Sequence, residues 1–358
     1  YQALRDYYEK WYRPDQQGII VVGDIDVDKV EAKIKELFSP IKMPANAAER
    51  KYEPVPDNKE PIVTIAKDKE QPTTMIYIWH KHPATPNEAK GNIGYLVQNY
   101  LFSMISSMMH ARLEELRQGA NPPFIQAASG DSDFLLSKTA EAFVGMAVSK
   151  DDGIPTAISA LVREIERARK FGFTASEYAR AKADYLRSLE SAYNERDKMK
   201  NNQYVQEYVR HFIDNEPIPG IETEYALMNQ LAPNIPVEAI NMILPQLIKD
   251  ENIVINVFGP DKEGMVYPTE EEILDILKNT KAEEITAYVD KVSDEPLMKE
   301  TPKAGKIVKT EAGPFGSTAL TLSNGVRVVV KNTDFKADEI RMTAFSPGGT
   351  SIFGTKEA

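Results

Sequence analysis

In the stretch FGFTASEYARAKADY, residues 171–185, one helix is expected to end and the next to begin. Gly172 stands where a glycine ends a helix as its C′ residue. Thr174 and Glu177 have the spacing of a capping box, in which each side chain satisfies a backbone N–H of the other residue. We therefore expect a helix–turn–helix junction inside a long helical region.

Strands flank this helical region on both sides. Runs rich in β-branched and aromatic residues predict strands at residues 62–66, 74–80, 124–128, 139–148 and 252–258. An acidic turn is expected between the third and fourth strands, and a long apolar helix between Pro86 and about Leu116. The predicted fold class is α+β, a mixed or antiparallel sheet of about five strands with helices packed on one side.

Two polar, proline-containing stretches without periodicity, residues 44–61 and 291–316, predict linkers. They divide the chain into a tail at residues 1–43, a domain at residues 62–290, and the first strands of a further domain at residues 317–358. The tail is predicted to be helix, strand (residues 18–22) and helix, the last of these capped by Asp26. We interpret it as the end of a larger domain.

The last segment contains the clearest hairpin signal of the chain. Residues 320–323 and 326–330 flank Asn324-Gly325, the preferred pair for a type I′ turn, and a third strand is expected at residues 339–345. So short a segment cannot bury a core by itself. Because the chain also opens without Met and stops just after Gly348-Gly349, we expect it to be a segment excised from a longer protein.

Composition excludes several classes of function. A net charge of -11, spread along the chain, argues against nucleic acid or an anionic membrane surface as partner. The chain has no cysteine, so any metal would have to be bound by His, Asp or Glu. No apolar stretch approaches the roughly 18 residues that a membrane span requires, and no signal-peptide pattern opens the chain.

Four histidines, His80, His82, His110 and His211, are the candidate metal ligands. His80 and His82 alternate along a strand, so they point to one face and could hold a metal as a pair. Without a nearby third ligand such a site is poor, and a place at a strand end favours surface or domain-contact roles. His110 and Glu114 are four apart on a helix, a spacing that suits a ligand pair or a simple contact.

The remaining candidates have simple structural interpretations. Met104, Met108 and Met109 could line an adaptable peptide-binding surface, but their helical spacing favours the core. Arg112 and Arg117 could bind a substrate carboxylate, although salt bridges to Glu are commoner. Acids at the start of a helix (Glu270, Glu271 and Glu272) and two turn pairs (Asn324-Gly325 and Gly348-Gly349) need no functional explanation. We assign no catalytic, cofactor-binding or metal-binding residue.

Specific strings along most of the chain resemble the insulinase and pitrilysin family of zinc peptidases, in the long bacterial form that fuses two similar halves. They are YYEKWYRPDQQGIIVVGDIDVDKVEAKIKELF at 7–38, RLEELRQGANPPFIQA at 112–127, FGFTASEYARAKADYLRSLESAYNERDK at 171–198, HFIDNEPIPGIETE at 211–224, VFGPDKEG at 257–264 and LTLSNGVRVVVKNTDFKADEIRMTAFSPGGTS at 320–351. The resemblance implies the end of the catalytic domain, a second, non-catalytic domain of metallohydrolase fold, and the start of the second half.

The family's inverted zinc motif, His-x-x-Glu-His, does not occur in this sequence. The resemblance therefore places that motif and the third ligand, a Glu, before Tyr1, and the family's substrate-binding Arg and Tyr in a fourth domain beyond this segment. No cofactor is expected in this chain, while zinc is expected in the intact parent. The chain alone should be inactive.

The resemblance implies a parent that cleaves peptides with a zinc-activated water inside a closed chamber. This segment would brace the missing catalytic domain, form chamber wall and hinge, and pack against the second half, in the periplasm or cell envelope of a bacterium. The alternative is a catalytically inactive relative that acts as a structural or peptide-binding subunit, which an upstream sequence without the zinc motif would favour. A third possibility gives His80 and His82 a metal site of their own.

Overall fold

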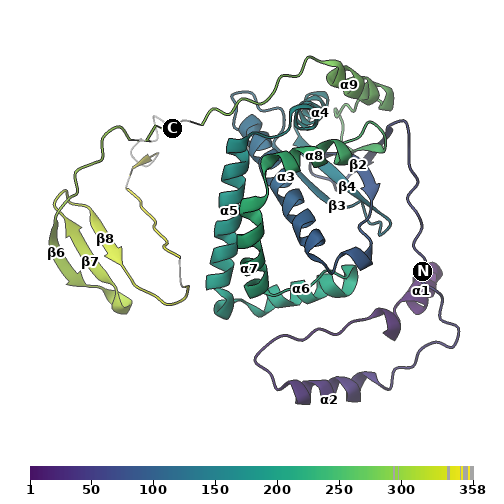
Figure 1. The fold of residues 1–358 in the computed structure, drawn as a ribbon, viewed down its shortest axis with the longest axis horizontal. Coiled ribbons are helices and arrows are strands. Elements are labelled where there is room, and N and C mark those ends of the chain that lie inside the picture. Colours follow the sequence, from purple (N-terminus) through teal and green to yellow (C-terminus); the bar gives the residue numbers. More distant parts are fainter. Residues whose placement is uncertain (293–294, 297, 337–338, 347, 350–353, 355–358) are drawn as a thin grey trace. The chain divides into compact units, whose positions relative to one another are not determined.

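The computed structural model describes residues 1–358 except 293–294, 297, 337–338, 347, 350–353 and 355–358. The chain forms two compact units (Figure 1). The first comprises Tyr1–Ser188 with Lys200–Val292, and the second comprises Leu189–Met199 with Ser293–Ala358. Among the described residues, no helix is long and apolar enough to cross a membrane.

A five-stranded sheet is the centre of the first unit. Its strands are β1 (Ile62–Asp68), β2 (Thr74–Pro83), β3 (Gln126–Asp133), β4 (Ala140–Ser149) and β5 (Ile253–Pro260), in the spatial order β1-β5-β2-β4-β3. β1 and β5 pair in parallel, whereas the other neighbours are antiparallel. This mixed sheet confirms the predicted α+β class and all five predicted strands in the first unit.

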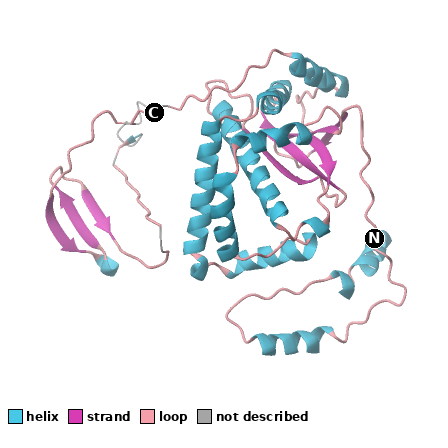
Figure 2. Ribbon diagram, in the orientation of Figure 1, coloured by secondary structure: helices cyan, strands magenta, loops and turns pink. Residues whose placement is uncertain are grey.

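Helices cover one face of the sheet (Figure 2). The helices that follow β2 in the chain are α3 (Ile93–Arg117), α4 (Ile154–Phe171), α5 (Ala175–Asn194), α6 (Asn201–Asp214), α7 (Ile221–Leu231), α8 (Val237–Leu247) and α9 (Glu270–Ala282). Of these, α3, α4, α8 and α9 contact the strands of the sheet. On that face Gly145 of β4 lies so close to Leu161 and Ile165 of α4 that an added Cβ would come within 2.8 Å of Ile165. Ile76 and Ile78 of β2 are almost completely buried there. The prediction of helices on one side is confirmed.

The junction at residues 171–185 has the predicted geometry. Gly172 follows α4 with φ +69°, a conformation that glycine adopts at little cost. The Thr174 N–H donates to Oε2 of Glu177 at 2.8 Å, and the Glu177 N–H donates to Oγ1 of Thr174 at 3.2 Å. The capping box is thus confirmed as the start of α5.

The first 43 residues form helices but no strand. α1 (Gln2–Trp11) and α2 (Val27–Phe38) are helical, Pro14–Gln16 is a short 3-10 helix, and Asp26 caps α2 by accepting from the Lys29 N–H at 3.2 Å. Neither α1 nor α2 buries a residue. The strand predicted at residues 18–22 is wrong, because a strand needs a hydrogen-bonded neighbour and this apolar run pairs with none of the described residues.

The second unit contains a three-stranded antiparallel sheet of β6 (Ile307–Ala312), β7 (Thr318–Leu322) and β8 (Arg327–Val330). Gly325 turns between β7 and β8 with φ +85°, so the predicted hairpin is confirmed. The linker prediction is wrong at residues 307–312, which form β6. The strand predicted at 339–345 is also wrong, since those residues are described without strand pairing. Residues 347 and 350, around Gly348-Gly349, lie outside the described residues.

Candidate functional site

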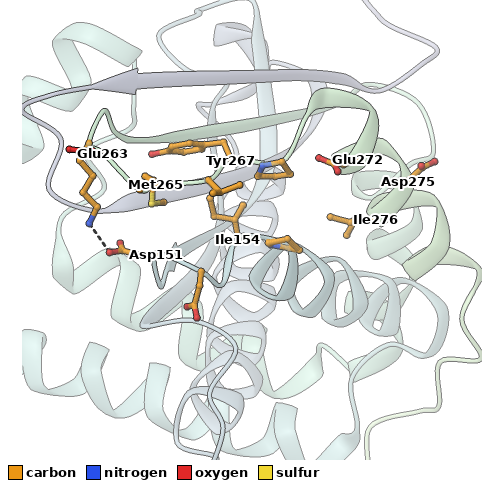
Figure 3. Close-up of a pocket in the computed structure, with 14 residues that line it drawn as sticks. Asp151, Ile154, Glu263, Met265, Tyr267, Glu272, Asp275 and Ile276 are labelled. Atoms are coloured by element: carbon orange, nitrogen blue, oxygen red, sulfur yellow. Dashed lines mark hydrogen bonds and ion pairs between the residues drawn. The ribbon is translucent and has the colours of Figure 1, made fainter.

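A cavity of about 930 Å³ opens between the β4–α4 turn, the β5–α9 loop and the first turns of α9 (Figure 3). Its apolar lining includes Ile154 at the start of α4, Met265 and Tyr267 of the loop, and Ile276 of α9. The Tyr267 hydroxyl donates to the Pro260 carbonyl at 2.9 Å, which fixes the ring as one wall.

Two of the acids that line this cavity have structural partners. Asp151 binds Nζ of Lys262 at 2.6 Å, and Glu272 accepts from the Thr269 N–H at 2.7 Å in the capping box of α9. The described lining residues include no histidine. The apolar lining of the cavity can therefore accommodate an apolar group.

A second group of polar side chains lies on the helix-covered face, at the end of the sheet. His82 of β2 is paired in register with Glu141 of β4, and Asp131 of β3 is paired with Phe143 of the same β4. A ring nitrogen of His82 and one carboxylate oxygen from each acid lie within 4.8 Å of one another. Asp131 and Glu141 also line a cavity of about 590 Å³. We call these three residues the His82 cluster.

Hydrogen bonds hold each member of the His82 cluster. Nε2 of His82 lies 2.7 Å from Oδ2 of Asp131, and Nδ1 lies 3.2 Å from the Pro83 carbonyl oxygen. Glu141 accepts from the Thr85 N–H at 3.2 Å and from the Thr85 hydroxyl at 3.3 Å. The cluster is therefore oriented by the surrounding backbone as well as by its own contacts.

The electrostatics of the cluster favour protonation of His82 and Glu141. Burial disfavours the charged His82 ring, but the hydrogen bond and charge of Asp131 outweigh it and raise the pKa of His82 above its ordinary value. Burial is the main reason why the pKa of Glu141 is also raised, with a further contribution from the charge of Asp131. Two carboxyl groups in so small a space thus compete for positive charge.

His80 lies outside this cluster. Its Nδ1 is 3.2 Å from the Lys249 carbonyl oxygen, and its side chain is 3% exposed. Burial, with a contribution from the nearby Lys281 charge, lowers the pKa of His80 to about 4. His80 and His82 therefore have separate partners and do not form a shared pair. Of the surface or domain-contact roles that we expected, a surface role is wrong for His80, which is buried, while His82 is partly buried and domain contact stays a prediction.

Sequence reasoning missed Asp131 and Glu141. We expected an acidic turn around Asp131, whereas β3 continues through Asp133 and the turn follows at residues 134–139. Glu141 shares its strand face with the buried Phe143 and Ala147. A carboxylate at a core-facing position of an alternating strand was the signal that could have identified it.

The other candidates have the structural roles that we favoured. Met104, Met108 and Met109 are buried in the core. Arg112 binds Glu177 at 2.6 Å, and Arg117 binds Glu114. Glu270, Glu271 and Glu272 form the first turn of α9. His110 is exposed on α3, and the exposed His211 contacts the Glu216 carbonyl oxygen at 2.6 Å.

With this geometry established, comparison with known proteins identifies the family. Residues 1–185 match the peptidase M16 inactive domain. The chain belongs to this family. The M16 match agrees with the zinc-peptidase resemblance carried by the sequence strings, which is thereby confirmed.

Curated relatives of this M16 chain are named as zinc proteases. It is 26% identical over 355 residues to a zinc protease PQQL-like protein of Arabidopsis thaliana, covering 98% of this chain and 33% of that protein. It is also 26% identical over 360 residues to the probable zinc protease PqqL of Escherichia coli, covering 99% of this chain and 38% of that protein. The chain thus spans only about a third of the length of these relatives.

Solved structures show the same M16 fold. The crystal structure of the periplasmic protease PqqL from Escherichia coli matches with a TM-score of 0.64 and 24% identity, covering 92% of this chain and 36% of that one. The ferredoxin protease FusC, solved as a point mutant in complex with Arabidopsis ferredoxin, matches with a TM-score of 0.60 and 19% identity, covering 92% of this chain and 36% of that one.

Proposed function

We propose that this chain is the non-catalytic part of a zinc-dependent metalloendopeptidase that hydrolyses peptides in a closed chamber. The observation that carries the proposal is the match of residues 1–185 to an inactive peptidase domain. Likeness to proteins named as zinc proteases extends over nearly the whole chain. The chain itself supplies no catalytic residue in this proposal.

The sheet face opposite the helices is the proposed chamber wall. On this face Trp79 packs edge-on against Phe134 and donates from Nε1 to Oδ1 of Asn256 at 2.7 Å. Asn256 in turn donates to Oγ1 of Thr64 at 2.6 Å, and Tyr77 stacks on Trp79. Tyr77 and Asn256 are only partly buried. A rigid face that mixes aromatic and amide groups suits contact with an extended peptide of varied sequence.

We propose a separate role for each segment between the predicted domain boundaries. Residues 1–43 belong to the end of a catalytic-type domain, residues 44–61 connect it to the non-catalytic domain at 62–290, and residues 317–358 begin the next domain. Because β6 occupies residues 307–312, we restrict the proposed hinge to residues 291–306. Bracing of the catalytic domain by residues 62–290 is part of the same proposal.

The zinc site, the peptide substrates and the cellular location are proposed as properties of the whole parent protein. We propose that its zinc is bound in the catalytic domain, that its substrates are unfolded peptides, and that this chain packs against the catalytic domain and the second half. A periplasmic or cell-envelope location in a bacterium is supported by the periplasmic protease PqqL of Escherichia coli, whose fold this chain shares.

Substitution on the proposed wall tests this function. In the protein encoded by the whole gene, Tyr77→Asp should raise KM for an unfolded peptide several-fold and leave kcat nearly unchanged, because it removes substrate contact and not chemistry. Tyr208→Asp, an exposed tyrosine on α6, is the matched control and should leave KM unchanged. Circular dichroism must show both variants folded.

Three outcomes would count against the proposed wall and peptidase. One is an unchanged KM in folded Tyr77→Asp, and another is an equal rise in the control. The third is a whole-gene product that hydrolyses no peptide and lacks the inverted zinc motif, which would instead favour a structural or peptide-binding subunit.

A further inference from the structure

We propose that His82, Asp131 and Glu141 form a binding site for one divalent transition-metal ion, with Zn²⁺ as the preferred ion. The inference goes beyond the proposed peptidase role, because all three ligands lie in the non-catalytic domain. It depends on the described side chains of this chain alone.

The donor atoms have the right chemistry for such an ion. Imidazole nitrogen and carboxylate oxygen are both zinc ligands, at about 2.0–2.2 Å. Mg²⁺ and Ca²⁺ prefer oxygen ligands alone, so the histidine favours a transition metal. One histidine and two carboxylates also neutralise the charge of a divalent ion.

Three neighbouring strands bring the donors together. The order β2-β4-β3 places His82 and Asp131 on either side of the strand that carries Glu141. The donor atoms already lie within 4.8 Å of one another. Two ligands on one zinc ion are about 3–3.5 Å apart, so small side-chain rotations would complete the site without moving the backbone.

The surrounding contacts orient the ligands as those of metal sites are oriented. A metal-binding histidine usually donates its other ring N–H to a carbonyl or carboxylate. In His82 the Pro83 carbonyl lies beside Nδ1, which leaves Nε2 directed at Asp131. Thr85 donates to Glu141 from its N–H and its hydroxyl, and the Thr85 hydroxyl accepts from Nε2 of Gln98 at 3.1 Å.

The His82 ring has an oxygen acceptor beside each of its nitrogens. A neutral imidazole has only one N–H, so it can satisfy only one of these acceptors. In the tautomer that carries its proton on Nδ1, the Nδ1–H donates to the Pro83 carbonyl and the Nε2 lone pair is available to a metal ion. Metal binding would displace any proton at Nε2, as expected for ligands that must be deprotonated.

The adjoining cavity is lined by more acids, Asp131, Asp133, Glu141, Asp214 and Glu216, than bases, Lys90 and Arg210. Lys90 there binds Oε1 of Glu216 at 3.2 Å, and Lys138 binds both Asp133 and Asp214 at 2.6 Å. These two lysines are thus engaged by other acids. The cavity of about 590 Å³ leaves room for water or a further ligand at the open side of the ion.

Isothermal titration of the 358-residue chain with Zn²⁺ tests the site. Wild type should bind one Zn²⁺ per chain, and the isosteric variants Asp131→Asn and Glu141→Gln should each bind at least about 10-fold more weakly because each loses a charged ligand. Asp133→Asn is the matched control, since Asp133 lines the same cavity but pairs with Lys138. It should bind Zn²⁺ like wild type.

Thermal unfolding provides a second measurement that separates binding from folding. Zn²⁺ should raise the Tm of wild type and Asp133→Asn, because a ligand that binds the folded state stabilises it. The same addition should leave the Tm of folded Glu141→Gln nearly unchanged. Absence of binding by wild type at about 100-fold molar excess, or undiminished binding by both ligand variants, would overturn the site. Either result leaves the proposed peptidase function unaffected.

Discussion

Arg112 of α3 and Glu177 of α5 form a bidentate ion pair, with Nε–Oε1 at 2.6 Å and Nη2–Oε2 at 2.9 Å. Both residues are buried. Nη2 also donates to the Gly172 carbonyl at 3.0 Å, and the guanidinium lies over the rings of Phe173 and Tyr288. Arg112 thus links α3 to the α4–α5 junction, and its partner Glu177 also caps α5.

Removal of Arg112 should be strongly destabilising. Arg112→Ala leaves Glu177 charged and without this partner in the interior, which typically costs about 3–5 kcal/mol. The expected result is a decrease of that size in the free energy of unfolding, measured by urea denaturation followed by circular dichroism. A loss below about 1 kcal/mol, the range of an exposed pair, would contradict the account.

The matched control for Arg112 lies on the same helix. Arg117 pairs with Glu114 three residues earlier, with Arg117 43% exposed. Exposed pairs contribute only about 0.2–1 kcal/mol, so Arg117→Ala should stay within that range. Equal losses from the two arginines would show that burial does not decide the effect.

Gly172→Ala should lower the stability of the fold by more than the positive φ of this residue alone explains. An added Cβ at Gly172 would lie 2.4 Å from Cγ of Asn241, whose amide binds both the N–H and the carbonyl of Phe173. Overpacking of this kind costs about 1–3 kcal/mol beyond the backbone strain. Gly264→Ala, also at positive φ but with no atom within 4 Å, shows the effect of a positive φ without a collision. Similar changes in Tm for both variants would contradict the proposed collision.

Acid should destabilise the fold through His80. The folded-state pKa of about 4 lies below the ordinary value of 6.5, so the unfolded chain takes up this proton first as pH falls. The contribution is fully present above pH 6.5 and is lost between 6.5 and about 4, at up to about 1.4 kcal/mol per pH unit.

His80→Gln isolates that contribution, because glutamine does not titrate. Urea unfolding from about pH 7 to about pH 4.5 should give a shallower decline in the free energy of unfolding for the variant than for wild type. Groups elsewhere, including His82 with its raised pKa, contribute equally to both proteins. Identical slopes would exclude a buried, neutral His80.

Local signals predicted the parts of this fold that local chemistry determines. Gly172 ends α4, Thr174 and Glu177 start α5, and Asn324-Gly325 turns the last hairpin, because each depends on neighbours within a few residues. Burial of Met104 and Met108 followed from helical spacing on one apolar face. The family strings indicated the same order of elements.

Features that depend on distant partners were missed. The apolar run at residues 18–22 has strand composition but pairs with no strand in the part of the chain that the structure describes. The polar segment at 307–312 is a strand because β7 pairs with it. The His82 cluster unites residues from three strands, and only the register places Asp131 and Glu141 beside the histidine. Spacing along the chain contains no information about such a register before the pairing is known.

If this chain is a non-catalytic part of a zinc peptidase, peptide hydrolysis should require the rest of the protein. Hydrolysis of an unfolded fluorogenic peptide should be measured for the protein encoded by the whole gene and for the 358-residue chain alone, each with and without a zinc chelator. We expect chelator-sensitive cleavage by the whole protein and none by the chain. Zinc-dependent cleavage by the chain alone, or a whole protein that binds zinc but cleaves no peptide, would contradict that expectation.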